Sequence, residues 1–298
     1  MDLRLAKVVR ASVRAAPRAV NILGIPFDGA VLGRKGAAGG PEGFRQAMAG
    51  FSNYDVDLGV GLEGARVFDL GDLVVGSDVV SAHKDIEREV GANLRKGSLL
   101  VLLGGDNSLS FPALRAYSQK LGKVGLVVVD SHLDLRGRIG GRPTSGSSYG
   151  LAIETVGGLD GRRVAEIGIH GFLNSRRYVE KAERLGVRVF TAQDVRRSGA
   201  KRVAEEAYEK AAKGADAVYL SVDLDAVDIA QVSGVSAPSA GGISGGELFE
   251  LATYFGGRDK VMCADIVELA PSLDPTGRSQ VVAATALVSL IAGFVGRK

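Results

Sequence analysis

The sequence contains a single cysteine, Cys263, among its 298 residues. A disulfide framework is therefore excluded, and a reducing compartment such as the cytoplasm is expected. The sequence also lacks any uninterrupted apolar run approaching ~18 residues, so we expect no membrane span. No large excess of one charge is present either. The net charge of +3 is spread along the chain and gives no reason to expect a nucleic-acid partner.

The first 18 residues are a local exception to this even distribution of charge. They hold five basic residues and one acid, a composition that also occurs in organelle transit peptides. The preferred interpretation of residues 1–18 is a solvated basic N-terminal arm. Basic residues interrupt every apolar stretch there, which argues against a secretory signal. The chain shows no internal repeat or linker, so residues 1–298 are predicted to form a single domain.

Short apolar runs alternate with helical patterns along the chain. Most of the runs are continuous, which is typical of strands buried on both faces of a parallel sheet. About eight β-α units are predicted, with helices outside the sheet. Periodicity alone leaves two architectures open, an open doubly wound sheet and a closed eightfold barrel. The runs are residues 19–25, 66–70, 99–103, 125–129, 163–169, 187–191, 217–222 and 260–267, and helical patterns include residues 85–96, 175–185, 200–213, 246–255 and 280–295.

Four of the predicted strands end in clusters of polar residues. Residues 104–108 read Gly-Gly-Asp-Asn-Ser, residues 130–134 read Asp-Ser-His-Leu-Asp, and residues 221–228 read Ser-Val-Asp-Leu-Asp-Ala-Val-Asp. The fourth strand is followed by Glu268. Ligand sites in parallel α/β folds lie beyond the carboxyl ends of the strands. We therefore expect these clusters to meet in a binding site.

The cluster Asp130, His132 and Asp134 indicates a metal site. At a strand end, alternate side chains can fall on one side, so two carboxylates and an imidazole face one point. Such groups repel one another unless a cation lies between them. Asp223 and Asp225 add two carboxylates after another strand. An oxygen-rich set with little histidine suits Mn²⁺ better than Zn²⁺, and five ligands with bridging carboxylates suit two ions.

The other two histidines lack acidic neighbours of this kind. His83 lies in a polar helical stretch and is expected at the surface of the protein. His170 directly follows a predicted strand. Two positions are compatible with this: His170 faces the site, or it lies outside the site.

Together these clusters closely resemble the ureohydrolase family, which includes arginase, agmatinase and formimidoylglutamase. Its members carry G-G-D-H-S, D-A-H-x-D and S-x-D-x-D-x-x-D in this order, then a glutamate in an E-x-x-P context, here residues 268–271. The resemblance extends over nearly the whole chain and includes residues 24–28 and 39–41. It implies an α/β fold, a three-layer α/β/α sandwich around an eight-stranded, mostly parallel sheet. It also implies a metal-dependent hydrolase of C–N bonds in linear amidines.

The family pattern implies a role for each matching residue. Asp130 and Asp223 would bridge two Mn²⁺ ions per subunit. His132 and Asp225 would complete one of the two metal sites. Asp134 would bind the other ion and steady the bridging hydroxide, which makes it a catalytic candidate.

Two further positions follow from the same resemblance. Glu268 matches the glutamate that faces the cationic guanidinium or amidinium group of the substrate. Asn107 departs from the pattern, because it stands where the family has a histidine that binds the first metal ion. An amide oxygen is a weaker ligand for Mn²⁺ than imidazole. Asn107 is therefore a doubtful ligand, and we expect the first metal site to be weak.

Within the family, local runs look most like formimidoylglutamase. They are residues 134–136 (Asp-Leu-Arg), 144–149, 168–175 and 234–238. Agmatinases and arginases place a histidine near the position of Tyr149, and this chain has none there. Arg136 is a candidate clamp for a substrate carboxylate, because its planar fork matches that group, and a surface ion pair is the alternative. Ser145 and Tyr149 are further candidates for substrate binding.

The first functional hypothesis is hydrolysis of N-formimidoyl-glutamate to glutamate and formamide. A second is a guanidino hydrolase that releases urea from agmatine, arginine or guanidinobutyrate. A third is a catalytically weak, metal-binding relative, which Asn107 keeps open. The expected partner is a small amidine or guanidino substrate, and analogy with the family predicts a homo-oligomer, a trimer or hexamer.

Overall fold

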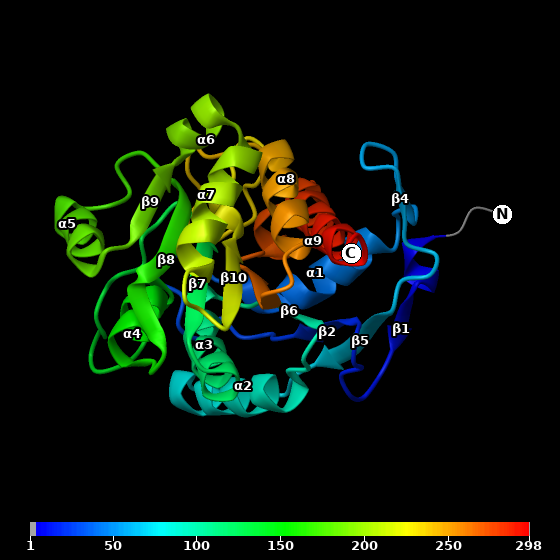
Figure 1. The fold of residues 1–298 in the computed structure, drawn as a ribbon, viewed down its shortest axis with the longest axis horizontal. Coiled ribbons are helices and arrows are strands. Elements are labelled where there is room, and N and C mark those ends of the chain that lie inside the picture. Colours follow the sequence, from blue (N-terminus) through cyan, green and yellow to red (C-terminus); the bar gives the residue numbers. More distant parts are fainter. Residues whose placement is uncertain (1–3, 298) are drawn as a thin grey trace.

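The computed structural model describes residues 4–297, which form one layered arrangement of helices around a central sheet (Figure 1). The sheet has nine strands, and every pairing in it is parallel. From one edge to the other its strands are β1 (Val9–Ala11), β5 (Val67–Asp72), β2 (Val20–Gly24), β6 (Leu99–Leu103), β11 (Val261–Val267), β10 (Ala217–Asp223), β7 (Val124–Val129), β8 (Leu159–Ile169) and β9 (Arg188–Thr191). A separate antiparallel pair consists of β3 (Tyr54–Asp55) and β4 (Val60–Gly61).

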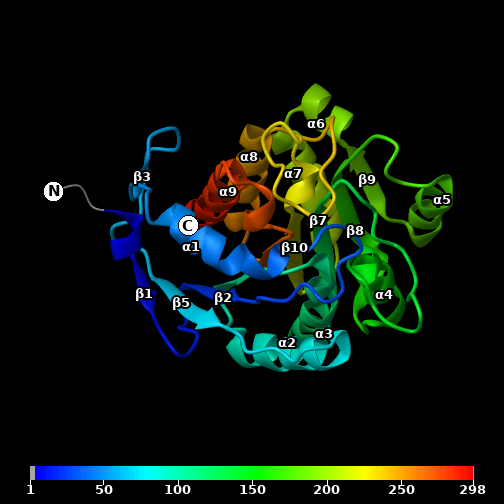
Figure 2. The same cartoon turned by 180° about the vertical axis from the view of Figure 1, so that it is seen from behind.

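Helices cover both faces of the sheet, as the two opposite views show (Figures 1 and 2). Side chains of one face pack with α1 (Gly40–Met48), α6 (Ala192–Ser198), α7 (Ala200–Ala212), α8 (Gly245–Gly256) and α9 (Arg278–Val295). Side chains of the other face pack with α2 (Val79–Asn93), α3 (Ser110–Leu121), α4 (Ser148–Thr155) and α5 (Arg176–Leu185). The predicted three-layer α/β/α sandwich is therefore confirmed, and the sheet is open rather than closed into a barrel.

The eight predicted runs correspond to eight of the nine strands. The central strands β2, β6, β7 and β10 are buried along their whole length, which explains their continuous apolar sequences. The sheet has one more strand than the resemblance implies. The extra strand, β1, pairs with β5 at the edge and comes from the segment predicted to be a solvated arm.

The N-terminal segment therefore packs on the domain in part. Leu5 and Val8 are buried, and Asn93 Oδ1 accepts a hydrogen bond from the backbone N–H of Ala15. Arg10 and Arg14 remain exposed, as expected for a basic arm. The burial of two apolar side chains, which the basic composition obscures, holds the segment along the sheet edge.

His83 is not at the surface, contrary to the prediction. It lies on the inner face of α2, where only 8% of it is exposed, and its Nε2 lies 3.0 Å from Ser108 Oγ. Burial lowers the pKa of His83 to about 4, so the imidazole is neutral. The polar residues around it in sequence lie on the opposite face of the helix, which is why the local composition was misleading.

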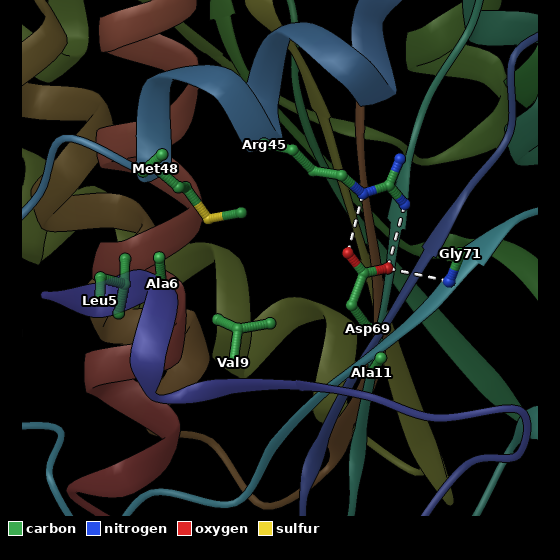
Figure 3. A pocket seen from close by; sticks show the side chains of 9 residues that line it. Leu5, Ala6, Val9, Ala11, Arg45, Met48, Asp69 and Gly71 are labelled. Atoms are coloured by element: carbon green, nitrogen blue, oxygen red, sulfur yellow. Dashed lines mark hydrogen bonds and ion pairs between the residues drawn. The ribbon is translucent and has the colours of Figure 1, made fainter.

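An apolar pocket of about 380 Å³ lies at the sheet edge, between the N-terminal segment and α1 (Figure 3). Leu5, Val9 and Met48 line it, and Arg45 closes one side through two hydrogen bonds to Asp69, of 2.8 and 3.0 Å. None of its lining residues belongs to the polar clusters that follow the central strands. The pocket is therefore separate from the site described below.

Within residues 4–297, one helix, α9, is long and apolar enough to cross a membrane by length and composition alone. Of its 18-residue span, 56% is buried in the structure. Its apolar side chains belong to the core that also contains α1 and α8. The packing of α9 is that of a core helix.

Candidate metal centre and active site

The polar clusters meet at the carboxyl ends of four strands that are neighbours in the sheet. The strand order places β6, β11, β10 and β7 side by side. Asn107 follows β6, Glu268 follows β11, Asp223 ends β10 and Asp130 follows β7. Because these pairings are all parallel, the four carboxyl ends lie at the same edge of the sheet. The order of the strands thus gathers residues that are far apart in sequence.

Asp130, His132 and Asp225 form the centre of the cluster. Their candidate ligand atoms all lie within 4.8 Å of one another. His132 Nδ1 lies 3.0 Å from Asp225 Oδ2 and 3.5 Å from Asp130 Oδ1. Ser131 Oγ donates to Asp225 Oδ1 at 2.7 Å, and the backbone N–H of His132 donates to Asp130 Oδ1 at 2.6 Å. These hydrogen bonds fix the orientation of both carboxylates.

Asn107 connects this centre to Asp134. Its Nδ2 donates to Asp134 Oδ2 at 2.6 Å and to Asp130 Oδ2 at 3.5 Å. Asp134 has a φ of +44°, in the left-handed region that residues other than glycine rarely adopt. Such strain costs on the order of 1–3 kcal/mol and persists where surrounding contacts hold the residue. Here the peptide N–H of Gly150 donates to the carbonyl oxygen of Asp134 at 3.1 Å.

Asp223 and Glu268 complete the acidic group. Asp223 Oδ1 accepts the backbone N–H of Asp225 at 2.9 Å, and Glu268 Oε1 accepts the backbone N–H of Asn107 at 2.8 Å. Glu268 also has a strained φ, of +70°. Its second oxygen, Oε2, is buried and meets no donor with hydrogen-bonding geometry in residues 4–297. A buried carboxylate oxygen without a donor is suited to a donor that a ligand brings.

The electrostatics of the cluster reflect buried charge of one sign. Burial raises the pKa of Asp130 well above its usual range, and the carboxylates of Asp225 and Asp134 add to the effect. Burial and the carboxylates of Asp225 and Asp130 do the same for the pKa of Asp223. Burial lowers the pKa of His132, but Asp130 and Asp225 outweigh it and raise that pKa to about 12. The carboxylates of Asp130 and Asp225 thus favour the protonated form of the His132 imidazole.

The donor set fits divalent manganese. Four aspartates would supply carboxylate oxygens and His132 would supply one imidazole nitrogen, which is the hard, oxygen-rich set that Mn²⁺ takes. Buried carboxylates that repel one another are costly unless a cation lies among them. A divalent ion relieves this repulsion more fully than a single imidazolium, because it carries twice the charge.

A pocket of about 220 Å³ opens onto this cluster. The segments after five strands, β2, β6, β7, β10 and β11, surround it, and Arg136 and Ser145 line it as the sequence predicts. Arg136 also lies over the ring of Tyr178, with 5.8 Å between its guanidinium carbon and the ring centre. Ser145 Oγ accepts the backbone N–H of Leu32 at 3.2 Å, which joins two of the loops. The lining residues are Leu32, Gly33, Asn107, His132, Asp134, Arg136, Ser145, Gly146, Asp223, Asp225, Ser236, Ala237 and Glu268.

Tyr149 and His170 do not line this pocket. Tyr149 is fully buried behind Asn107, and its hydroxyl donates to Asn107 Oδ1 at 3.0 Å. The expectation that Tyr149 contacts the substrate is therefore not supported, because α4 turns its side chain toward the sheet. His170 Nδ1 lies 2.7 Å from the carbonyl oxygen of Gly168, and its Nε2 lies 2.8 Å from Ser239 Oγ, both within hydrogen-bonding distance. It connects two loops outside the acidic cluster.

The comparison with known families agrees with this geometry. A model of the arginase family matches residues 18–293. The chain belongs to the arginase family. It is accordingly a hydrolase that acts on C–N bonds of amidines.

Individual members of the arginase family are similar over nearly their whole length. A formimidoylglutamase from Halobacterium salinarum is 38% identical over 281 residues, which cover 91% of this chain and 87% of that protein. The crystal structure of formimidoylglutamase from Bacillus subtilis has a TM-score of 0.93 at 26% identity, with 99% of this chain and 93% of that chain covered. Formiminoglutamase from Trypanosoma cruzi, crystallised with Mn²⁺, has a TM-score of 0.91 at 28% identity, with both chains covered completely.

Several polar residues behind the arginase-family site were missed by sequence reasoning. Asp265 accepts hydrogen bonds from Ser110 Oγ and Tyr219 Oη, both at 2.7 Å, yet it stands inside an apolar strand sequence. Ser131 orients Asp225 but stands where the family motif D-A-H-x-D has an alanine, which makes no side-chain hydrogen bond. Neither residue has a local sequence signal, because the partners of each are distant in the chain.

Glu166, on β8, is another buried acid of this hydrolase that the sequence does not single out. Its side chain is 0% exposed, and both Oε1 and Oε2 lack a hydrogen-bond partner within the described residues. Burial raises the pKa of Glu166 well above its usual range, and the carboxylates of Asp130 and Asp134 raise it further. The folded protein therefore holds Glu166 in its neutral form.

We expect Glu166→Gln to stabilise the metal-free hydrolase increasingly as pH rises. The unfolded chain loses the Glu166 proton near the ordinary pKa of glutamate, whereas the folded protein keeps it. The stabilising contribution of Glu166 is therefore complete below the unfolded pKa, and above it falls by about 1.4 kcal/mol per pH unit. This decrease in the free energy of unfolding ends at the pH at which Glu166 ionises in the folded protein. Glutamine does not titrate, so the variant does not show this decrease.

Urea unfolding of wild type and Glu166→Gln between pH 5 and pH 8, with chelator present, checks this expectation. The free energy of unfolding of the variant should exceed that of wild type by a margin that grows with pH. Glu209→Gln, on the exposed side of α7, serves as the control and should show no such trend. A margin that is constant with pH would contradict the buried neutral carboxyl.

Proposed function

We propose that this protein is a manganese-dependent formimidoylglutamase, which hydrolyses N-formimidoyl-glutamate to glutamate and formamide. The observation that carries the proposal is a pocket lined by acidic groups and by one arginine. Glu268, Asp223 and Asp225 are buried and form its base, and Arg136, which is exposed, forms part of its wall. The base suits a cationic amidine and the wall suits a carboxylate, and N-formimidoyl-glutamate carries both groups. The formimidoylglutamases among its relatives support the same substrate.

The metal ligands in this proposal are Asp130, His132, Asp134, Asp223 and Asp225, with Asn107 as a doubtful sixth. Bound Mn²⁺ would supply Lewis acidity and a water of lowered pKa as the nucleophile. We expect two ions per subunit, with the site nearest Asn107 the weaker, because an amide is a poorer ligand than imidazole.

The side chains around the metal would bind the substrate and move protons. Glu268 Oε2, which has no donor of its own, would accept a charge-assisted hydrogen bond from the amidinium and so orient its central carbon toward the aspartates. Burial raises the pKa of Asp134, which makes this carboxylate suited to take up a proton and return it to the leaving amine. In the metal-free protein a hydrogen bond from Asn107 Nδ2 orients Asp134.

A guanidino acid would satisfy the same two contacts and would release urea. Arg136 and Glu268 therefore define a substrate class, an amidine that also carries a carboxylate. Agmatine lacks the carboxylate, so it should be a poorer substrate than either acid.

Arg136→Ala should raise KM for N-formimidoyl-glutamate by about 10- to 100-fold and leave kcat nearly unchanged. The lost contact is a charge-assisted hydrogen bond, worth roughly 1.5–3 kcal/mol, and it forms equally in the ground and transition states. Steady-state kinetics at saturating Mn²⁺ measure both constants. Arg138→Ala is the control, because Arg138 is exposed in the same loop and does not line the pocket. Equal KM values for wild type and Arg136→Ala would remove Arg136 from the substrate site.

A further inference from the structure

The side-chain amide of Asn107 is held by hydrogen bonds at both ends. Its Nδ2 donates to Asp134 and Asp130, as described above. Its Oδ1 accepts from Tyr149 Oη at 3.0 Å and lies 3.1 Å from Ser110 Oγ, whose one proton is directed to Asp265. In this orientation the amide offers the carboxylates two N–H groups, which have no lone pair for a metal ion. Asn107 can become an oxygen ligand only if its amide turns over.

A chain of buried hydroxyl groups lies behind the amide and ends on Asp265. Tyr149 Oη lies 2.9 Å from Ser221 Oγ, and Ser221 Oγ donates to Asp265 Oδ1 at 2.5 Å. Ser110 Oγ lies 2.7 Å from Asp265 Oδ2. All of these side chains are fully buried. An ionised carboxylate accepts hydrogen bonds and donates none, so Asp265 fixes the direction of the bonds that reach it.

This chain of hydroxyls has two hydrogen-bonding arrangements. In the first, Tyr149 donates to Asn107 Oδ1, and the amide N–H groups face the aspartates. Ser221 and Ser110 donate to Asp265, so no hydrogen lies between Tyr149 Oη and Ser221 Oγ. In the second, the amide is turned over. Tyr149 and Ser110 then accept from Asn107 Nδ2, Tyr149 donates to Ser221, and Ser110 donates to Asp265. Each polar group has a partner in both arrangements, but only the second places a hydrogen in every contact of the chain.

We infer that Tyr149 is a positioning residue for the first metal site, and that its hydroxyl reverses direction so that the Asn107 amide can turn over when manganese binds. Without a cation, an amide oxygen among carboxylates is repelled, and the N–H groups face them. With a cation among the carboxylates, the oxygen is attracted, and Ser221 takes the hydrogen bond of Tyr149. The inference rests on the proposed function, because it concerns the manganese site of that reaction.

Ser221 is the residue that separates the two arrangements. In Ser221→Ala the first arrangement keeps the bond from Tyr149 to Asn107. The second arrangement leaves the buried Tyr149 hydroxyl without an acceptor. Asp265 loses one donor in both arrangements, so this loss destabilises the metal-free and the metal-bound protein equally and does not change the affinity for the metal. Ser221→Ala should therefore weaken the first manganese site on the order of tenfold and leave the second site unchanged.

A double-mutant cycle with Tyr149→Phe tests the inference. Phenylalanine has no hydroxyl group that requires Ser221 Oγ as an acceptor. Ser221→Ala should therefore have no further effect on manganese affinity in the Tyr149→Phe background. Titration of each variant with Mn²⁺, with free ion measured by electron paramagnetic resonance, gives the two dissociation constants. Thermal melting followed by circular dichroism verifies that each variant folds, and Ser221→Cys, whose thiol is a weak acceptor, replaces Ser221→Ala if that variant does not fold.

The outcomes of this cycle are distinct. Weakening by Ser221→Ala only where Tyr149 is present supports the hydroxyl reversal. Equal weakening in both backgrounds is what a merely structural role predicts, and it overturns the inference while leaving the proposed function standing. A wild-type protein that binds no Mn²⁺ overturns the inference and the proposed function together.

Discussion

Asp223→Asn should abolish tight manganese binding and with it the hydrolysis of the substrate. Asp223 belongs to the acidic group that lines the pocket, and the family resemblance implies that it would bridge both ions. Loss of a group that merely supports a metal ligand costs ~10- to 100-fold in affinity or activity. Replacement of a bridging ligand should cost more than that. Activity assays and Mn²⁺ titrations of the same preparation measure the two effects.

The same substitution should stabilise the metal-free protein. Burial and the neighbouring carboxylates raise the pKa of Asp223 well above its usual range, so its ionised form is unfavourable in the folded state. Its contribution to stability is lost as pH rises above the unfolded pKa, and a neutral amide avoids this loss. Chelated Asp223→Asn should therefore melt at a higher temperature than chelated wild type at pH 7 or above. Added Mn²⁺ should raise the melting temperature of wild type alone.

Asp228→Asn provides a matched control within the same motif. The Asp228 carboxylate accepts backbone N–H groups of Ala230 and Gly241 and does not line the pocket. This variant should keep manganese binding and activity. If Asp223→Asn retained tight binding of two ions, the carboxylate cluster would not be the metal centre.

Glu268→Gln should lower kcat/KM by about 100-fold, with little effect on manganese affinity. Glutamine keeps the shape of the side chain and the acceptor for the backbone N–H of Asn107. Burial raises the pKa of Glu268 to about 8, and a cationic amidinium beside it favours the ionised form. The substitution removes this negative charge, and a charge-assisted hydrogen bond is worth roughly 1.5–3 kcal/mol. In the proposed function Glu268 would bind the cationic charge of the substrate, while the aspartates would hold the metal.

Glu209→Gln is the control for this measurement, since Glu209 is an exposed glutamate on α7, outside the pocket. It should leave the kinetic constants unchanged. A Glu268→Gln enzyme with wild-type kcat/KM would show that the free carboxylate oxygen is not the substrate anchor. A loss of Mn²⁺ binding in parallel with activity would place Glu268 in the metal centre instead.

Much of the fold follows from the sequence because its pattern is local. Continuous apolar runs predicted eight of the nine strands, and the polar residues after them predicted one edge of the sheet as the site. The strand β1 escaped prediction because it has only three residues and lies among basic side chains. Helix α2 begins at Val79, six residues before the predicted start, because Asp78 caps it through the N–H groups of Val80 and Ser81.

The parts of the site that the sequence did not reveal depend on tertiary contacts. Periodicity cannot give the strand order that places β6, β11, β10 and β7 together, because strands that are neighbours in the sheet are far apart in the chain. Tyr149 was expected at the substrate because agmatinases and arginases have a histidine near its position, but the direction of its side chain is set by the packing of α4. Glu166 and Asp265 stand inside apolar strands, where a single acid carries no local signal of its neighbours.

Identification of the products is the most direct measurement of the proposed activity. The purified protein, loaded with Mn²⁺, is incubated separately with N-formimidoyl-glutamate, guanidinobutyrate, arginine and agmatine, and proton magnetic resonance follows each reaction, alongside an assay for urea. We predict equal amounts of glutamate and formamide from N-formimidoyl-glutamate, at the highest kcat/KM of the four, and no reaction after chelation. Urea from a guanidino substrate as the fastest reaction, or hydrolysis that persists in chelator, would contradict a manganese-dependent formimidoylglutamase.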